Sequence, residues 1–224
     1  MGPGSTSLGA GLKIKREQSQ ALVFDLDGTL WDATETYAMA TNRVLTARKM
    51  IHEPISASKI AQSAGLPFDQ CFEFFFPTLE KDLRVSLAHD IVAEFDRVVQ
   101  VEGGKLFPGV RETLHKLSET LPLLIVSNCS DGYIEGFLTW SGYSKLFLDY
   151  ECYGRTGLSK SENIRLVMNR NSLRSGVYIG DTSGDEKAAQ EAGLVFIHAA
   201  YGFGSASPDA LAIKSLPEML NFLT

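Results

Sequence analysis

Four aspartates in two pairs have the spacing in this sequence that best suits chemistry. Asp25 lies near the end of the apolar segment 21–26 and Asp27 follows it directly, and side chains two residues apart in an extended segment point the same way. Two carboxylates brought together in a dry crevice repel, so one pKa should rise unless a cation lies between them. Asp181 and Asp185 follow a second apolar segment, at 177–180. Carboxylates gathered in this way could supply a nucleophile, a proton carrier and oxygen ligands for Mg²⁺ in preference to Zn²⁺.

Other polar residues follow further apolar segments. Ser127 and Asn128 end the run Leu-Leu-Ile-Val-Ser-Asn, where a hydroxyl and free backbone amides could bind a phosphate group. Asn128 fits a turn and a phosphate contact equally well. Lys160 lies between Ser159 and Glu162, a pair that resembles a capping box at a helix start. A lysine there opposes the helix dipole, and a nearby anion would account for its position.

The elements that carry these residues alternate between strands and helices. Short apolar strands are expected at residues 21–26, 123–127, 147–151, 177–180 and 195–198. Helices near 130–140, 161–170 and 184–192 separate the later strands. This order predicts an α/β fold with a Rossmann-like parallel sheet covered by helices on both faces. Ligands of such sheets bind beyond the carboxyl ends of the strands, where the polar residues lie.

The long interval between the first two strands is helical in pattern. Asp32 and Glu35 resemble a capping box, and apolar residues at helical spacing from Leu83 to Val98 are followed by Gly103-Gly104. We expect an inserted all-α cap domain at 32–105, a catalytic core at 21–31 and 106–224, and a disordered tail or cloning remnant at 1–20. The aromatic cluster from Phe72 to Phe76 is assigned to the interior of the cap rather than to a substrate platform.

Composition excludes several classes of protein. The 224 residues carry 21 Lys and Arg against 27 Asp and Glu, a net charge of −6, which argues against a nucleic-acid or anionic-membrane surface. No apolar run approaches the roughly 20 residues of a membrane span. Three cysteines without metal-ligand spacing (Cys71, Cys129 and Cys152) favour a reducing cytoplasm. We expect a cytoplasmic monomer or homodimer.

In order and spacing, these residues resemble the motifs of the haloacid dehalogenase superfamily, whose members are mostly phosphatases. The sequence D-x-D-G-T matches Asp25–Thr29, a strand ending in Ser or Thr matches Ser127, a lysine ahead of a helix matches Lys160, and G-D-x-x-x-D matches Asp181 and Asp185. The helical insert is similar to the cap of phosphoglycolate phosphatase-like and β-phosphoglucomutase-like members.

The resemblance implies a Mg²⁺-dependent phosphatase that acts on a small phosphate monoester, similar to phosphoglycolate or a sugar phosphate. Asp25 would attack phosphorus and form an aspartyl-phosphate, while Asp27 would protonate the leaving alcohol and then activate water. A phosphomutase and a non-catalytic regulatory module on this scaffold are the alternatives. A carbon–halogen dehalogenase is disfavoured, because it needs neither Asp27 as a proton carrier nor a metal.

The resemblance also implies the ligands. Mg²⁺ would be held by Asp25, the backbone carbonyl of Asp27 and Asp181, with Asp185 as a ligand or as support. Residues near Gln62 to Gly65 lie where this cap type often presents a substrate loop. The oxygens of the transferred phosphoryl group would be bound by Ser127, Asn128 and Lys160.

Overall fold

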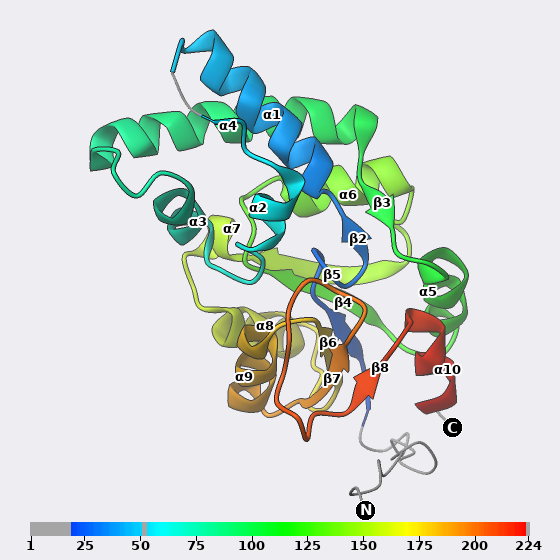
Figure 1. Ribbon diagram of the computed structural model, residues 1–224. Coiled ribbons are helices and arrows are strands. Elements are labelled where there is room, and N and C mark those ends of the chain that lie inside the picture. Colours follow the sequence, from blue (N-terminus) through cyan, green and yellow to red (C-terminus); the bar gives the residue numbers. More distant parts are fainter. Residues whose placement is uncertain (1–18, 51–52, 223–224) are drawn as a thin grey trace, which may run out of the picture.

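The computed structural model describes residues 19–50 and 53–222 (Figure 1). The tail predicted at 1–20 therefore lies outside the described residues, except for Ser19 and Gln20. Ser19 is buried, and the Gln20 side-chain oxygen accepts a hydrogen bond from the backbone N–H of Arg174 at 2.8 Å. These two residues belong to the folded part of the chain. Within the described residues, no helix has both the length and the apolar character needed to cross a membrane.

The core is built on a six-stranded sheet in the order β5-β4-β1-β6-β7-β8, in which every neighbouring pair is parallel. β1 and β4 are apolar almost throughout, as expected of strands that are covered on both faces. The strands are β1 (Leu22–Phe24), β4 (Leu123–Ser127), β5 (Phe147–Cys152), β6 (Val177–Gly180), β7 (Val195–Ala199) and β8 (Ala212–Ile213).

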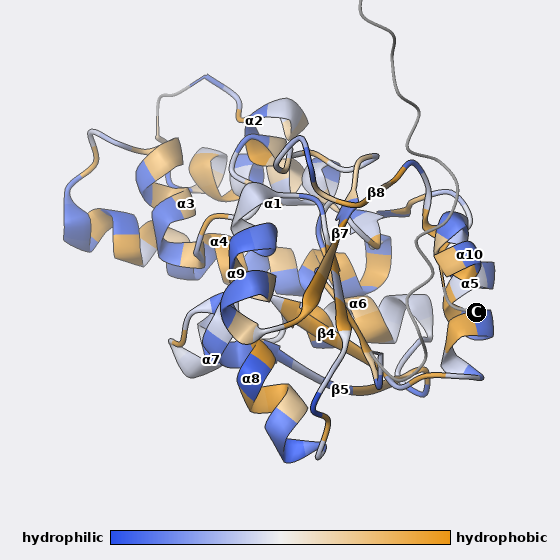
Figure 2. Cartoon of the chain, turned by 90° about the horizontal axis from the view of Figure 1, so that it is seen from below, coloured by the Kyte–Doolittle hydropathy of each residue, from blue (hydrophilic) through white to orange (hydrophobic). Residues whose placement is uncertain are grey.

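Successive residues of these strands point into two different apolar clusters. Leu22 and Ile125 belong to the larger cluster, whereas their neighbours Val23 and Leu124 belong to the smaller one on the other face. This alternation follows from the two-residue period of a strand. Figure 2 shows the apolar strands β4 and β7 at the centre of the molecule, between helices that carry both hydrophilic and hydrophobic residues.

Helices cover both faces of the sheet, which confirms the predicted fold class. α8 and α9 contribute to the smaller cluster, and α5, α6 and the C-terminal segment contribute to the larger one. The helical elements of the core are α5 (Val110–Ser118), α6 (Tyr133–Ser141), α7 (Tyr153–Thr156), α8 (Lys160–Arg170), α9 (Ser183–Ala192), a 3₁₀ turn (Leu216–Glu218) and α10 (Met219–Phe222).

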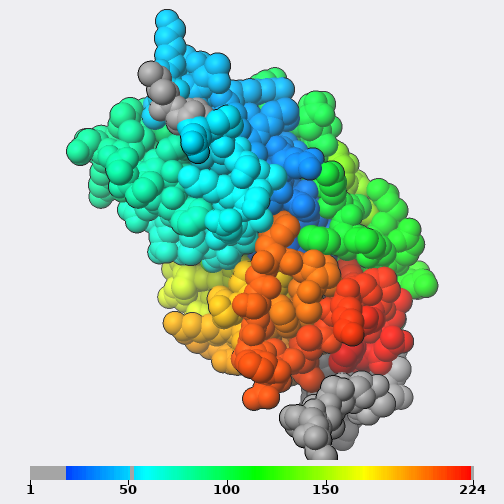
Figure 3. Space-filling view, in the orientation of Figure 1, coloured from blue at the N-terminus to red at the C-terminus, as the bar shows by residue number. Residues whose placement is uncertain are grey.

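A helical insert follows β1 in the chain. It leaves and returns through an antiparallel pair of short strands, and its helices gather around a third apolar cluster. Figure 3 shows it lying against one end of the core. The predicted domain boundaries at 32 and 105 fall on the strand pair and stay a prediction. The elements are β2 (Trp31–Asp32), α1 (Thr34–Ala47), α2 (Ala57–Ala61), α3 (Phe68–Phe75), α4 (Lys81–Glu102) and β3 (Lys105–Leu106).

The ends of two insert helices test the sequence interpretation. α4 stops at Gly103, which adopts φ +64°, so the predicted glycine stop is confirmed. The predicted capping box of Asp32 and Glu35 was wrong. Asp32 instead accepts hydrogen bonds from the backbone N–H and hydroxyl of Thr34, while Glu35 pairs at the surface with Lys105. The helix begins two residues after Asp32, and this places Glu35 too early to reach back.

We predict that Ile125→Ala lowers the free energy of unfolding by about 2–5 kcal/mol, because Ile125 is fully buried in the central part of the sheet. Leu148→Ala on β5 is the matched control. Leu148 is 56% exposed, and its truncation should change stability by no more than about 0.5 kcal/mol. Urea unfolding followed by circular dichroism measures both values. Equal losses would contradict the assignment of Ile125 to the core.

Candidate active site

The predicted site residues come together at the carboxyl ends of three neighbouring strands. Asp25 follows β1, Ser127 ends β4 and Asp181 follows β6. β1 lies between β4 and β6 in the sheet, so the three strand ends are adjacent. Lys160 reaches the same place from the first turn of α8.

Three of the four predicted aspartates form a compact acidic cluster. Carboxylate oxygens of Asp25, Asp181 and Asp185 lie within 4.8 Å of one another, and all three side chains are buried. Among the described residues, this is the group of His, Cys, Asp and Glu side chains that could hold a metal ion. Buried carboxylates at this separation repel strongly, so they require positive charge nearby.

Lys160 supplies one such charge. Its Nζ donates hydrogen bonds to Asp25 Oδ1 at 2.9 Å and to Asp185 Oδ1 at 2.5 Å. Its side chain is only about 5% exposed, and burial would favour the neutral amine. Asp185 and Asp25 outweigh this effect and hold the pKa of Lys160 well above its usual value. The lysine therefore stays charged, which explains why a cation occupies the first turn of α8.

One lysine does not neutralise the cluster. Burial raises the pKa of Asp25 to about 8, and repulsion from Asp185 and Asp181 adds to the rise while Lys160 opposes it. Burial and Asp185 likewise raise the pKa of Asp181 to about 6. A dication bound among these carboxylates would favour their ionised forms and add positive charge to the cluster.

The surroundings of Asp181 leave room for a ligand on one side of its carboxylate. Oδ2 accepts hydrogen bonds from the backbone N–H groups of Phe203 at 2.7 Å and Gly204 at 3.1 Å. Oδ1 is buried and has no hydrogen-bond partner among the described residues. At Gly28, whose φ is +78°, a Cβ would lie 2.2 Å from Asp181 Oδ2. The glycine of the first motif is therefore required for close packing as well as for its backbone conformation.

Asp185 is held differently from the other two acids of the cluster. Its Oδ2 accepts from the backbone N–H of Thr182 at 3.0 Å and from the Thr182 hydroxyl at 2.7 Å, which completes a capping box at the start of α9. Its Oδ1 accepts the bond from Lys160. Both oxygens are thus already engaged, and the position of Asp185 is fixed by the helix that it caps.

Asp27 lies apart from the cluster and contacts an aromatic side chain. The Tyr133 hydroxyl donates a hydrogen bond to Asp27 Oδ1 at 2.5 Å. Burial raises the pKa of Asp27 to about 7, although the bond from Tyr133 opposes the rise. A carboxyl group with this pKa can both carry and release a proton near neutral pH. Tyr133 was not identified from the sequence, because an aromatic residue at a helix start is typical of core packing.

Ser127 and Asn128 line the same cavity as the aspartates. Ser127 is buried at the end of β4. Asn128 Nδ2 donates to the backbone carbonyl of Gly65 at 3.0 Å, so this side chain connects the core to a loop of the insert. The contact had no signal in the sequence, since the two residues lie 63 positions apart.

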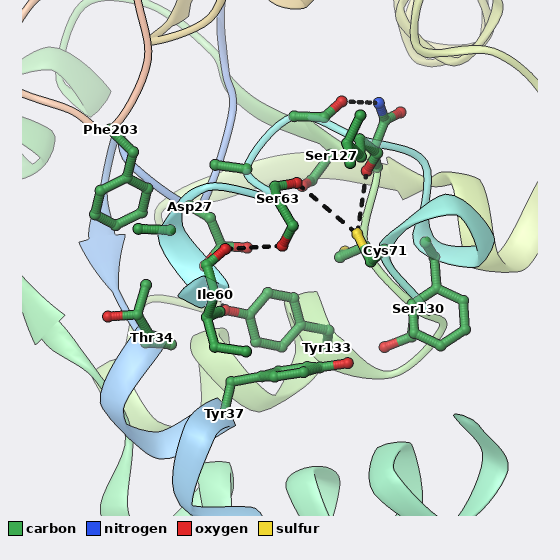
Figure 4. A pocket seen from close by; sticks show the side chains of 18 of the residues that line it. Asp27, Thr34, Tyr37, Ile60, Ser63, Cys71, Ser127, Ser130, Tyr133 and Phe203 are labelled. Atoms are coloured by element: carbon green, nitrogen blue, oxygen red, sulfur yellow. Dashed lines mark hydrogen bonds between the residues drawn. The ribbon is translucent and has the colours of Figure 1, made fainter. Parts of the chain in front are cut away.

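A cavity of about 110 Å³ lies over Asp25 and Asp27 (Figure 4). The insert forms much of its wall, including Ser63 and Gly65 of the predicted substrate loop. Phe72 is buried in the insert as predicted, whereas Phe75 of the same cluster lines the cavity. Phe203, in the loop after β7, had not been singled out from the sequence. No local pattern marks this residue, because its place depends on the bond from its backbone N–H to Asp181.

Comparison with known proteins agrees with this geometry. Residues 22–199 match the family model described as haloacid dehalogenase-like hydrolase. A phosphoglycolate phosphatase of Rhodobacter capsulatus is 30% identical over 199 residues, which cover 85% of this chain and 89% of the relative. A phosphoglycolate phosphatase of Synechococcus elongatus is 30% identical over 220 residues, which cover 92% and 97%.

Solved structures share the fold. A haloacid dehalogenase-like family protein from Streptococcus pneumoniae superposes with a TM-score of 0.78 at 22% identity and covers 92% of this chain and 99% of its own. CbbY from Rhodobacter sphaeroides, in complex with xylulose-(1,5)bisphosphate, has a TM-score of 0.75 at 16% identity, with coverages of 89% and 96%. The resemblance seen in the motifs is confirmed, and this chain belongs to the haloacid dehalogenase-like hydrolase family.

Proposed function

We propose that this enzyme is a phosphatase that hydrolyses small phosphate monoesters, with Asp25 as a covalent nucleophile. The observation that carries the proposal is the position of Asp25, which lines the cavity and lies 2.9 Å from the buried Lys160 ammonium within the acidic cluster. A nucleophilic carboxylate, a fixed cation and oxygen ligands for a metal are the parts that phosphoryl transfer needs. The phosphoglycolate phosphatases among the relatives support this reaction class.

The residues of the cluster fit Mg²⁺. The donors are all oxygens, and Asp181 Oδ1 is a buried acceptor without a partner among the described residues. In our proposal Asp25, Asp181 and the backbone carbonyl of Asp27 hold the ion. Asp185 supports the site from behind, because its oxygens already accept from Lys160 and Thr182. When bound, the ion would neutralise repulsion between the nucleophile and the phosphate group.

The proposed reaction has two steps. The Asp25 carboxylate attacks phosphorus, the bond from phosphorus to the ester oxygen breaks, and Asp27 gives its proton to the departing alkoxide. Asp27, now ionised, takes a proton from water, and the hydroxide attacks phosphorus and releases phosphate and the Asp25 carboxylate. The Tyr133 bond occupies one oxygen of Asp27 and so leaves the other for proton transfer.

Binding of the transferred group is assigned to Lys160 and Ser127, both of which line the cavity beside Asp25. Lys160 would attract the phosphoryl oxygens by charge, and the Ser127 hydroxyl would donate a hydrogen bond. Asn128 remains a candidate for a phosphate contact. In the structure its side-chain amide donates to the backbone carbonyl of Gly65. A contact with the phosphate group would require Asn128 to give up this bond.

We predict that Asp25→Asn lowers kcat by at least about 10³-fold, because the amide is not a nucleophile. Phosphate release from several monoesters, measured with Mg²⁺ and with a chelator, tests the reaction and its metal dependence. Asp209→Asn is the control, since Asp209 is exposed in a loop of the core and should keep wild-type activity. Wild-type turnover in Asp25→Asn, or turnover that the chelator does not reduce, would contradict the mechanism.

A second prediction concerns Asp27. Asp27→Asn should react with acetyl phosphate, whose leaving group needs no proton, and then stall, because no base activates water. The protein should therefore gain the mass of one phosphoryl group, and intact-protein mass spectrometry measures this. Asp25→Asn provides the control, since it should gain nothing. A stalled phosphoryl group on both variants would place the nucleophile elsewhere.

A further inference from the structure

The part of the cavity beyond the two catalytic aspartates is mainly apolar. Ile60, Leu66, Phe68 and Phe75 of the insert line it, and Phe203 of the core completes the wall. Figure 4 shows side chains from both parts of the chain around Asp27. A leaving group must occupy this space, because the phosphoryl group lies at the Asp25 end. Its surface would be removed from water against hydrocarbon, which favours apolar groups.

The charged residues that line the cavity also favour an uncharged leaving group. Of the described residues that line it, Lys160 is the one basic side chain, and it is already paired with Asp25 and Asp185 at the phosphate end. The other charged groups in the lining are Asp25 and Asp27, both acids. A carboxylate or second phosphate on the leaving group would therefore be buried without a cation of its own in the lining.

Tyr37 gives the cavity an uncharged polar group. Its ring packs against Phe95 at 4.7 Å between centroids, and it lines the cavity from α1. Within the described parts of the chain its hydroxyl makes no hydrogen bond. Burial raises the pKa of Tyr37 above its usual value, so the hydroxyl stays neutral. It can bond a hydroxyl or carbonyl oxygen of a neutral ligand.

From these contacts we propose that the leaving group is an uncharged, largely apolar alcohol, and that the site discriminates against leaving groups that carry a second anion. This inference rests on the proposed phosphatase function and names its substrate class. The inference predicts faster hydrolysis of esters with a neutral leaving group than of phosphoglycolate, whose leaving group carries a carboxylate. We expect this discrimination because the wall around the leaving group is apolar. In addition, the described residues of the lining offer no cation that is not already paired.

The test compares three esters whose leaving groups have the same branched arrangement of non-hydrogen atoms. Phosphoglycolate, acetol phosphate and isobutyl phosphate differ mainly in whether the leaving group is anionic, neutral and polar, or apolar. With Mg²⁺ present, kcat/KM for both neutral esters should exceed that for phosphoglycolate by at least about tenfold, since an unpaired like charge is costly. Equal or better turnover of phosphoglycolate would overturn this inference while leaving the phosphatase function intact. Failure to hydrolyse any ester would overturn both.

Variants at the wall provide a second test. Ile60 is half-buried on α2 and lines the cavity, so Ile60→Lys should place a cation near the leaving group. The ratio of kcat/KM for phosphoglycolate to that for isobutyl phosphate should rise at least about tenfold. Ile60→Met controls for side-chain length, and its ratio should stay within about twofold of wild type.

Leu66→Lys with Leu66→Met repeats the comparison at a second lining position, in case Ile60→Lys does not fold. The ratio is read within one protein, so a general loss of activity leaves it unaffected. An unchanged ratio in the folded lysine variants would overturn the assignment of this wall to the leaving group.

Discussion

The site depends on the contact between the Lys160 ammonium group and the buried carboxylates around it. Three buried carboxylates repel one another when ionised, and Lys160 offsets this repulsion by contacting two of them directly. α8 places the lysine at its first turn, and its long side chain reaches Asp25 after β1 and Asp185 in α9. The unfavourable effect on the helix dipole, about 0.3–1 kcal/mol, is small beside the repulsion that the lysine offsets.

The parallel sheet explains how residues from distant parts of the chain reach this lysine. Asp25, Ser127 and Asp181 are separated by more than fifty residues in each case, yet they follow neighbouring strands that end at the same edge. Glycines then allow the loops to approach closely, as at Gly28 beside the Asp181 carboxylate. Sheet order determines which residues meet, and the loops determine how closely they pack.

Sequence patterns predicted the sheet strands that have long apolar runs, because such runs report burial on both faces. They also predicted the capping box of Ser159 and Glu162, which is local in sequence. The two-residue strands β2, β3 and β8 were not predicted, since elements this short have no period to detect. The Asn128–Gly65 bond and the Tyr133–Asp27 bond depend on how the insert and core pack, and no local pattern contains that information.

The placement of Tyr133 links two parts of the enzyme that would otherwise be independent. Its ring lies against Phe95 of α4 and against Trp31, at 5.1 and 5.6 Å between centroids, and its hydroxyl holds Asp27. The orientation of Asp27, the proposed proton carrier, is thus coupled to the position of a 22-residue helix of the insert. Among the described residues, the hydrogen bonds of Asp25 and Lys160 instead run within the core, to Ile179, to Asp185 and to each other. Displacing α4 would therefore misplace Asp27, the proposed acid, while leaving Asp25, the proposed nucleophile, in position, so the two proposed steps could fail separately.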